Sequence, residues 1–176
     1  MKLFKANVEQ WGDDPFLGTR QKDAAGNAGP YTWQTYKEVN EKAVNLARGL
    51  MLNEMCPEIR DGDKTFRFCG IWSKNRWEWN TTLLACMHYN VTGIGFYDAM
   101  GPESVEFVLN QTEMTNMVVG GEYIKKIVDM RKNGMAAHIK TLISMDAIDS
   151  DLVQEAAAVN ITVSTFDEIM KQGKEN

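Results

Sequence analysis

The sequence predicts an α/β fold, with a doubly wound, mostly parallel sheet of about five strands, helices on both faces and a preceding β-hairpin. From residue 66 onward, short β-prone runs alternate with amphipathic helical segments, a pattern typical of parallel sheets connected by helical crossovers. The runs "NMVVG" and "TLISM" are almost entirely apolar, as expected for strands that are covered on both faces.

Residues 1–34 are predicted to form an amino-terminal segment that contains the hairpin. "PFLGTR" and "YTW" are β-prone, and they flank "KDAAGNAGP", whose Gly, Asn and Pro residues are typical of turns. Residues 35–176 are then predicted to form the α/β scaffold.

A helix is predicted directly after the hairpin. Thr35 and Glu38 have the spacing of a capping box, in which each side chain bonds a free amide of the first helical turn. Apolar residues then recur at helical spacing and form one stripe, which consists of Tyr36, Val39, Ala43, Leu46, Ala47 and Leu50.

The remainder is predicted to contain five strands, each followed by a helix. Pro102 suits the first turn of its helix, because its fixed φ is already helical. Proline has no amide hydrogen, and at this position an amide would have no carbonyl partner within the helix. The polar end "KQGKEN" is the part that most resembles a linker. The predicted strands cover residues 66–72, 91–97, 116–120, 139–145 and 161–166, and the helices cover residues 75–89, 102–111, 122–132, 149–159 and 167–172.

The stretch "SKNRWEW" separates the first of these strands from its helix. Asn75 is a suitable N-cap, and Glu78 places a carboxylate in the first helical turn, where the helix dipole favours it. Arginine between tryptophans could also stack on bases. The chain is acidic, however, with a net charge of −5, and single-strand binders also need a positive groove. We therefore predict no nucleic-acid partner.

Three cysteines occur at positions 56, 69 and 86 without a C-x-x-C pair, which favours buried thiols in a reducing compartment. The sequence has no apolar run near the roughly 18 residues that a membrane helix requires. We expect these 176 residues to be soluble and cytoplasmic, and membrane association of a longer parent protein stays open.

The candidate sites for chemistry are weak. Cys86, His88 and the distant His138 lack the paired spacing of a zinc site. The glycines in "VVGGEY" could present amides to a phosphate, but Glu122 would repel it and the P-loop lysine is missing. "DGD" at residues 61–63 is predicted to be a turn. We therefore assign no catalytic, cofactor-binding or metal-binding residue.

In its order of motifs, the chain resembles the amino-terminal region of the long-chain acyl-CoA synthetases, in the adenylate-forming superfamily. The segments that carry the resemblance extend from about residue 16 to the end, with Met100 where the family commonly has Leu. They are "FLGTR", "YTWQTYKEV", "GD" before a strand, "SKNRWEW", "LACMHYNVTGIGFYDAMGPESVEFVLNQTE" and "FDEIMKQGKEN".

The resemblance implies a two-step ligase in the parent protein. A fatty acid and ATP, with magnesium, form an acyl-adenylate, and coenzyme A then accepts the acyl group. The family's phosphate loop, its Tyr-Gly-x-Thr-Glu motif and its catalytic lysine have no counterpart in these residues. The resemblance therefore implies an amino-terminal portion without synthetase activity of its own. Its partners would be the rest of the synthetase, or further copies that meet through exposed apolar surface.

A second interpretation is a stand-alone, non-catalytic α/β module that binds a nucleotide, a flavin or a partner. Folds of this class place ligands at the carboxyl ends of their strands. The loops at residues 73–75, 97–101 and 120–122 would then form the site.

Overall fold

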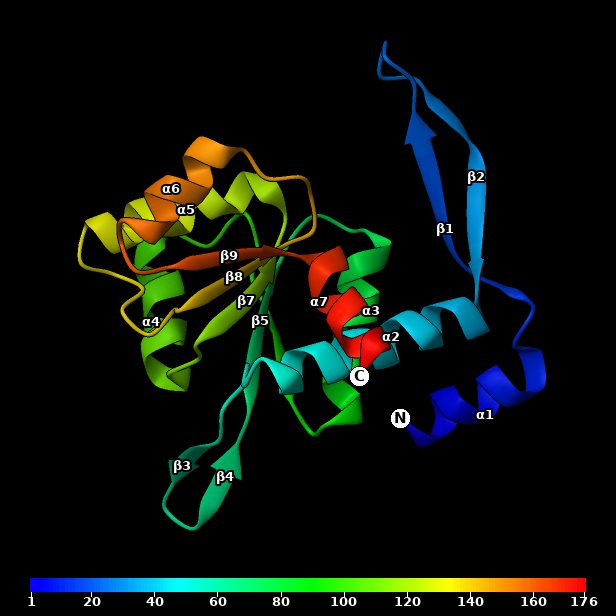
Figure 1. Cartoon of the computed structure of the whole chain (residues 1–176), viewed down its shortest axis with the longest axis horizontal. Helices are drawn as coiled ribbons and strands as arrows, with labels where there is room; N and C mark the ends of the chain where they lie inside the picture. Colours follow the sequence, from blue (N-terminus) through cyan, green and yellow to red (C-terminus); the bar gives the residue numbers. More distant parts are fainter.

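The computed structural model describes residues 1–176, with residue 22 described by its backbone alone. Its centre is a five-stranded parallel sheet with strand order β6-β5-β7-β8-β9 (Figure 1). The predicted fold class is confirmed. The strands are β5 (Phe68–Trp72), β6 (Thr92–Gly95), β7 (Asn116–Val119), β8 (Thr141–Ser144) and β9 (Thr162–Thr165).

Helices cover both faces of this sheet. One face packs against α4 (Pro102–Thr112), α5 (Gly121–Lys132) and α6 (Ser150–Ala157). The other face packs against α2 (Tyr36–Leu52), α3 (Trp77–His88) and α7 (Phe166–Glu175).

The alternation of side chains along β7 shows why residues 117–119 of this strand are all apolar. Met117 and Val119 belong to the core beneath α4 and α5, whereas Val118 belongs to the core beneath α2 and α3. Successive side chains of a strand point to opposite faces, so a sheet that is covered twice needs apolar residues at every position.

The predicted hairpin is also present, as β1 (Pro15–Lys22) and β2 (Ala28–Thr35). It projects away from the central sheet (Figure 1). The capping box at its end is confirmed, because the Glu38 amide donates to the Thr35 hydroxyl at 3.2 Å and the Thr35 amide donates to the Glu38 carboxylate at 2.7 Å.

The sequence did not predict helix α1 (Lys2–Trp11). Its N-cap residue, Met1, makes no side-chain capping bond, so the usual signal for a helix start is missing. Phe4 lies 5.6 Å from Phe16 of β1 and 6.2 Å from Tyr36 of α2, measured between ring centroids. This aromatic contact attaches α1 to the hairpin and to α2.

The predicted strand at residues 66–72 was too long. A second antiparallel hairpin, β3 (Ile59–Asp61) and β4 (Lys64–Phe66), precedes β5. The predicted turn at residues 61–63 connects its strands, with Gly62 at a φ of +62°. Arg67 lies between β4 and β5, and its guanidinium donates to the Cys56 carbonyl at 3.0 Å.

The predicted linker character of "KQGKEN" was also wrong, because α7 extends to Glu175. A second capping box starts this helix, with the Glu168 amide donating to the Thr165 hydroxyl at 3.2 Å. Gly173 is buried against α2. The polar residues of this segment therefore form the outer face of a packed helix.

Candidate functional site

The three loops of the second interpretation lie at one edge of the sheet, which we call the carboxyl edge. The Phe96 amide donates to the Ile71 carbonyl at 2.8 Å, and the Gly120 amide donates to the Trp72 carbonyl at 2.9 Å. The ends of β6 and β7 therefore flank the end of β5. Doubly wound folds bind ligands at such an edge, which makes the carboxyl edge the first candidate for a site.

Arg76 is the centre of a charged network at the carboxyl edge. Its guanidinium donates to the Glu78 carboxylate at 2.7 and 2.8 Å and to the Asp146 carboxylate at 2.8 and 2.9 Å. It also donates to the Met145 carbonyl at 3.1 Å. Glu78 is buried, with 7% of its surface exposed. Hydrogen bonds to Glu78, ahead of those to Asp146, hold the pKa of Arg76 above its ordinary value, so the network stays charged.

The predicted N-cap of α3, Asn75, was wrong. The N-cap residue is Arg76 rather than Asn75, and no side chain caps this helix. Glu78 does lie in the first turn, as predicted. Its carboxylate bonds Arg76, and the bidentate fork of arginine makes this pair stronger than a neutral capping bond.

The glycine turn before α5 is already occupied by a protein carboxylate. The Gly121 amide donates to Asp146 Oδ2 at 2.8 Å. Burial raises the pKa of Asp146, but the Gly121 amide and Arg76 outweigh it and hold this pKa below the ordinary 3.8. A Cβ at Gly120 would lie 2.5 Å from the Glu122 carboxylate, which is folded back over the turn. The turn therefore does not fit a phosphate.

The floor of the carboxyl edge is aromatic. Trp72 stacks on Tyr123 at 4.9 Å and on Phe96 at 5.7 Å, and Lys126 Nζ lies 4.5 Å from the Trp72 ring centroid. The Tyr123 hydroxyl donates to Asp98. Burial, followed by this bond, raises the pKa of Tyr123 to about 12. The rings of Trp72, Phe96 and Tyr123 are thus packed against one another at this edge.

The predicted thiol burial is confirmed, and the three cysteines are neighbours in the core beneath α2 and α3. Cys69 shares hydrogen bonds with Cys56 and Cys86, and these bonds together with burial hold the pKa of Cys69 well above its ordinary value. Asn116 Nδ2 also donates to Cys69 Sγ at 3.3 Å. The neighbouring Cys69, in turn, lowers the pKa of Cys56. All three thiols are free and buried in this core, where they pack against its apolar side chains.

Cys86, His88 and His138, which were considered above as zinc ligands, do not come together in the structure. Cys86 is buried in the core, whereas His88 is the last residue of α3 and His138 lies between α5 and β8. Within the described part of the chain, no group of three or more His, Cys, Asp or Glu side chains is placed to hold a metal ion.

Comparison with known proteins identifies the family. The model of the AMP-binding enzyme family matches residues 4–174. Fatty acyl-CoA synthetase B of Dictyostelium discoideum is 30% identical over 96% of this chain and 24% of the relative. Long chain acyl-CoA synthetase 5 of Arabidopsis thaliana is 28% identical over 98% of this chain and 24% of the relative. The chain thus spans about a quarter of the length of these relatives.

Solved structures share the fold. The A-PCP didomain of carboxylic acid reductase from Segniliparus rugosus, in complex with AMP, matches with a TM-score of 0.74 and 17% identity, over 97% of this chain and 26% of the other. The adenylation domain of the carboxylate reductase from Mycobacterium chelonae matches with a TM-score of 0.74 and 19% identity, over 99% of this chain and 29% of the other.

The family model covers nearly the whole chain, and the parallel sheet with its preceding hairpin agrees with the adenylation domains. No helix among the described residues is long and apolar enough to cross a membrane. The chain belongs to the family of AMP-binding enzymes.

Proposed function

We propose that this chain is the amino-terminal lobe of an ATP-dependent long-chain fatty acid–CoA ligase and that it has no synthetase activity by itself. The proposal rests on family membership and on relatives that are named long-chain acyl-CoA synthetases. Within this lobe, residues 1–34 would be an amino-terminal segment with the hairpin, and residues 35–176 the α/β scaffold. Fatty acid, ATP, magnesium and coenzyme A would be bound by the longer protein.

The observation that carries the predicted inactivity is the occupied glycine turn. The family implies a nucleotide and magnesium, but the Gly121 amide is bonded to Asp146 and the Glu122 carboxylate covers the turn. A triphosphate carries several negative charges and needs free amides and cations. The carboxyl edge of this lobe presents carboxylates at that point, so it does not fit a triphosphate.

An activity assay tests the inactivity. The isolated chain is incubated with oleate, ATP and magnesium, and pyrophosphate release is measured beside a full-length long-chain acyl-CoA synthetase as the positive control. We expect no release above the rate without protein. Turnover comparable to that of the full-length enzyme would overturn this part of the proposal.

A second measurement separates the lobe from a stand-alone module. Calorimetry with ATP, AMP and a flavin is expected to show no binding to the isolated chain at micromolar concentrations. Micromolar affinity for any of them would favour the stand-alone module instead.

The ligase assignment needs the longer protein. We expect the natural reading frame to continue beyond residue 176 into a Gly/Ser/Thr-rich loop, and the complete product to form acyl-CoA from oleate. A reading frame that stops at residue 176, or a complete product without this activity, would refute the assignment.

A further inference from the structure

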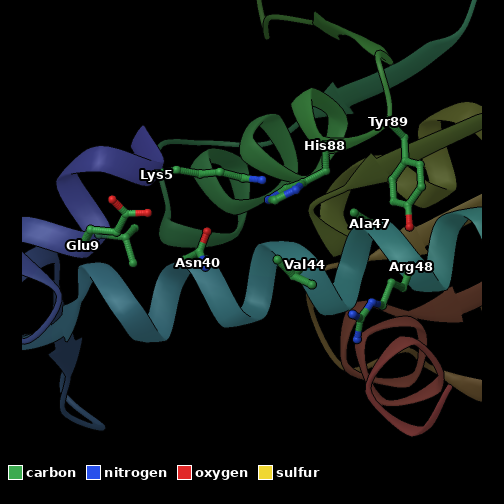
Figure 2. Close-up of a pocket in the computed structure, with 9 residues that line it drawn as sticks. Lys5, Glu9, Asn40, Val44, Ala47, Arg48, His88 and Tyr89 are labelled. Carbon is green, nitrogen blue, oxygen red and sulfur yellow. The ribbon is translucent and has the colours of Figure 1, made fainter. Parts of the chain in front are cut away.

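A groove of about 550 Å³ lies between α1, α2 and the carboxyl end of α3 (Figure 2). Its volume falls within the range of small-molecule sites, about 300–1,000 Å³. Because α3 begins after β5 and ends before β6, the groove lies near the opposite edge of the sheet from Arg76. It is lined by Lys5, Val8, Glu9, Asn40, Val44, Ala47, Arg48, His88 and Tyr89.

Two cations of this groove lack carboxylate partners. Among the described residues, no carboxylate lies within 4.0 Å of the charged nitrogens of Lys5 or Arg48. Glu9 is the carboxylate of the lining, and Lys5 extends away from it toward His88 (Figure 2). The groove therefore has uncompensated positive charge in a chain whose net charge is −5.

Two buried polar atoms in the wall also lack hydrogen-bond partners. They are Asn40 Oδ1 and His88 Nε2. An unmade bond of this kind costs about 1–3 kcal/mol, so a ligand or water that supplied the partners would be favoured. Figure 2 shows the end of Lys5 pointing toward the His88 ring, and Asn40 of α2 lines the same groove. Burial, followed by the charges of Lys5 and the amino terminus, lowers the pKa of His88.

From these contacts we infer that the groove binds a small phosphate-bearing anion, either free phosphate or a compact phosphomonoester whose body is smaller than a nucleoside or a flavin. Lys5 and a His88 N–H would donate to phosphate oxygens, and the P–O–H group of a monoprotonated phosphate would donate to Asn40 Oδ1. Sulfate and carboxylates carry no such donor at neutral pH. The unpaired acceptor at Asn40 is therefore the feature that favours phosphate.

The rest of the groove suits the body of a phosphomonoester. Val44 and Ala47 provide an apolar floor on α2, and Arg48 and Tyr89 lie at the far end (Figure 2). Asn40 and Arg48 are eight residues apart on one helix, which corresponds to about 12 Å. A compact ester could thus contact both ends. The inference is independent of the proposed ligase function.

The experiment is a titration of the full 176-residue chain with inorganic phosphate at constant ionic strength. Calorimetry measures the binding, and NMR of the imidazole groups measures the pKa of each histidine during the titration. We expect saturable binding and a rise in the pKa of His88, because a bound anion stabilises the imidazolium form. His138 does not line the groove, so its signals serve as the internal control and should not shift.

Matched variants locate the site. Lys5→Gln should weaken phosphate binding about tenfold, since it removes one charge-assisted hydrogen bond. Lys2→Gln removes the same charge from the same helix outside the groove and should leave the affinity unchanged. Both lysines are exposed, so both variants should fold, which circular dichroism checks. His88→Gln provides an independent test and should also weaken binding.

The comparison ligands identify the source of the phosphate and can refute the inference. Tighter binding of glycerol 3-phosphate that depends on Arg48 indicates a phosphomonoester, whereas binding of inorganic phosphate alone indicates the free anion. The inference is wrong if sulfate binds as tightly as phosphate. It is also wrong if Lys5→Gln and Lys2→Gln behave alike, or if phosphate leaves the pKa of His88 unchanged.

Discussion

Arg76 connects two carboxylates that are far apart in the chain. Glu78 is two residues away, and Asp146 is 70 residues away at the end of β8. The side chain of Glu78 is only 9% exposed and that of Arg76 is 29% exposed. Removing one partner of such a pair leaves a poorly solvated charge, which costs more than the pair contributes when it is intact.

We predict that Arg76→Met lowers the free energy of unfolding by about 2–4 kcal/mol, somewhat below the range for fully buried pairs because Arg76 is partly solvated. Urea denaturation followed by tryptophan fluorescence measures this loss. The double variant Arg76→Met, Glu78→Gln should be more stable than the single one, since it leaves no buried unpaired charge at Glu78. Lys74→Met is the control, because Lys74 is exposed in the same loop. Equal stability of Arg76→Met and Lys74→Met would contradict the role given to this network.

At the scale of elements, α2 and α7 pack with their backbones in contact. A Cβ added at Gly173 would lie 1.9 Å from the Asn45 carbonyl oxygen, and one added at Gly49 would lie 2.1 Å from the Ile169 carbonyl oxygen. The neighbouring atoms are backbone, so no rotamer change can make room. These two glycines therefore permit the close approach of the helices.

Gly173→Ala should destabilise the protein even though alanine is the better helix former. The intrinsic gain is about 1 kcal/mol, whereas overpacking costs about 1–3 kcal/mol and more where backbone must move. We expect a net loss of about 2 kcal/mol in thermal or urea unfolding. Gly95→Ala is the control, because its added Cβ would lie 3.6 Å from Trp79 Cζ2, an ordinary van der Waals contact. A neutral or stabilising Gly173→Ala would show that α7 can shift freely on α2.

At the scale of the whole molecule, the first hairpin carries exposed aromatic surface away from the core. Tyr31 is 58% exposed and Trp33 is 56% exposed, and their rings stack at 5.6 Å. Contiguous apolar patches favour association with another surface. If this chain is one lobe of a larger ligase, the rest of that ligase would be the natural partner.

In isolation, the chain is predicted to self-associate through this patch as its concentration rises. Sedimentation velocity should show an average mass that increases with concentration, and Tyr31→Ser with Trp33→Ser should shift it toward the monomer. Phe107→Ser removes an aromatic side chain that is 66% exposed on α4 and should leave the mass distribution unchanged. A double variant that associates like the original chain would rule out the hairpin as the contact.

The sequence by itself determined the features whose physical causes are local. The capping box at Thr35 and Glu38, the stripe of α2 and the turn at residues 61–63 depend on residues within about one helical turn or one hairpin of each other. The five strand–helix pairs follow from hydrophobic runs of the same short range. For this reason the fold class could be predicted, whereas α1, which has no capping side chain, could not.

Only the tertiary structure decided which distant residues meet. Arg76 reaches Asp146 because the strand order places β7 beside β5 and β8 next to β7. Gly173 is buried because α7 returns onto α2. Lys5, Asn40 and His88 come from three helices and line one groove. No local pattern marks such residues, since their proximity depends on the packing of the whole chain.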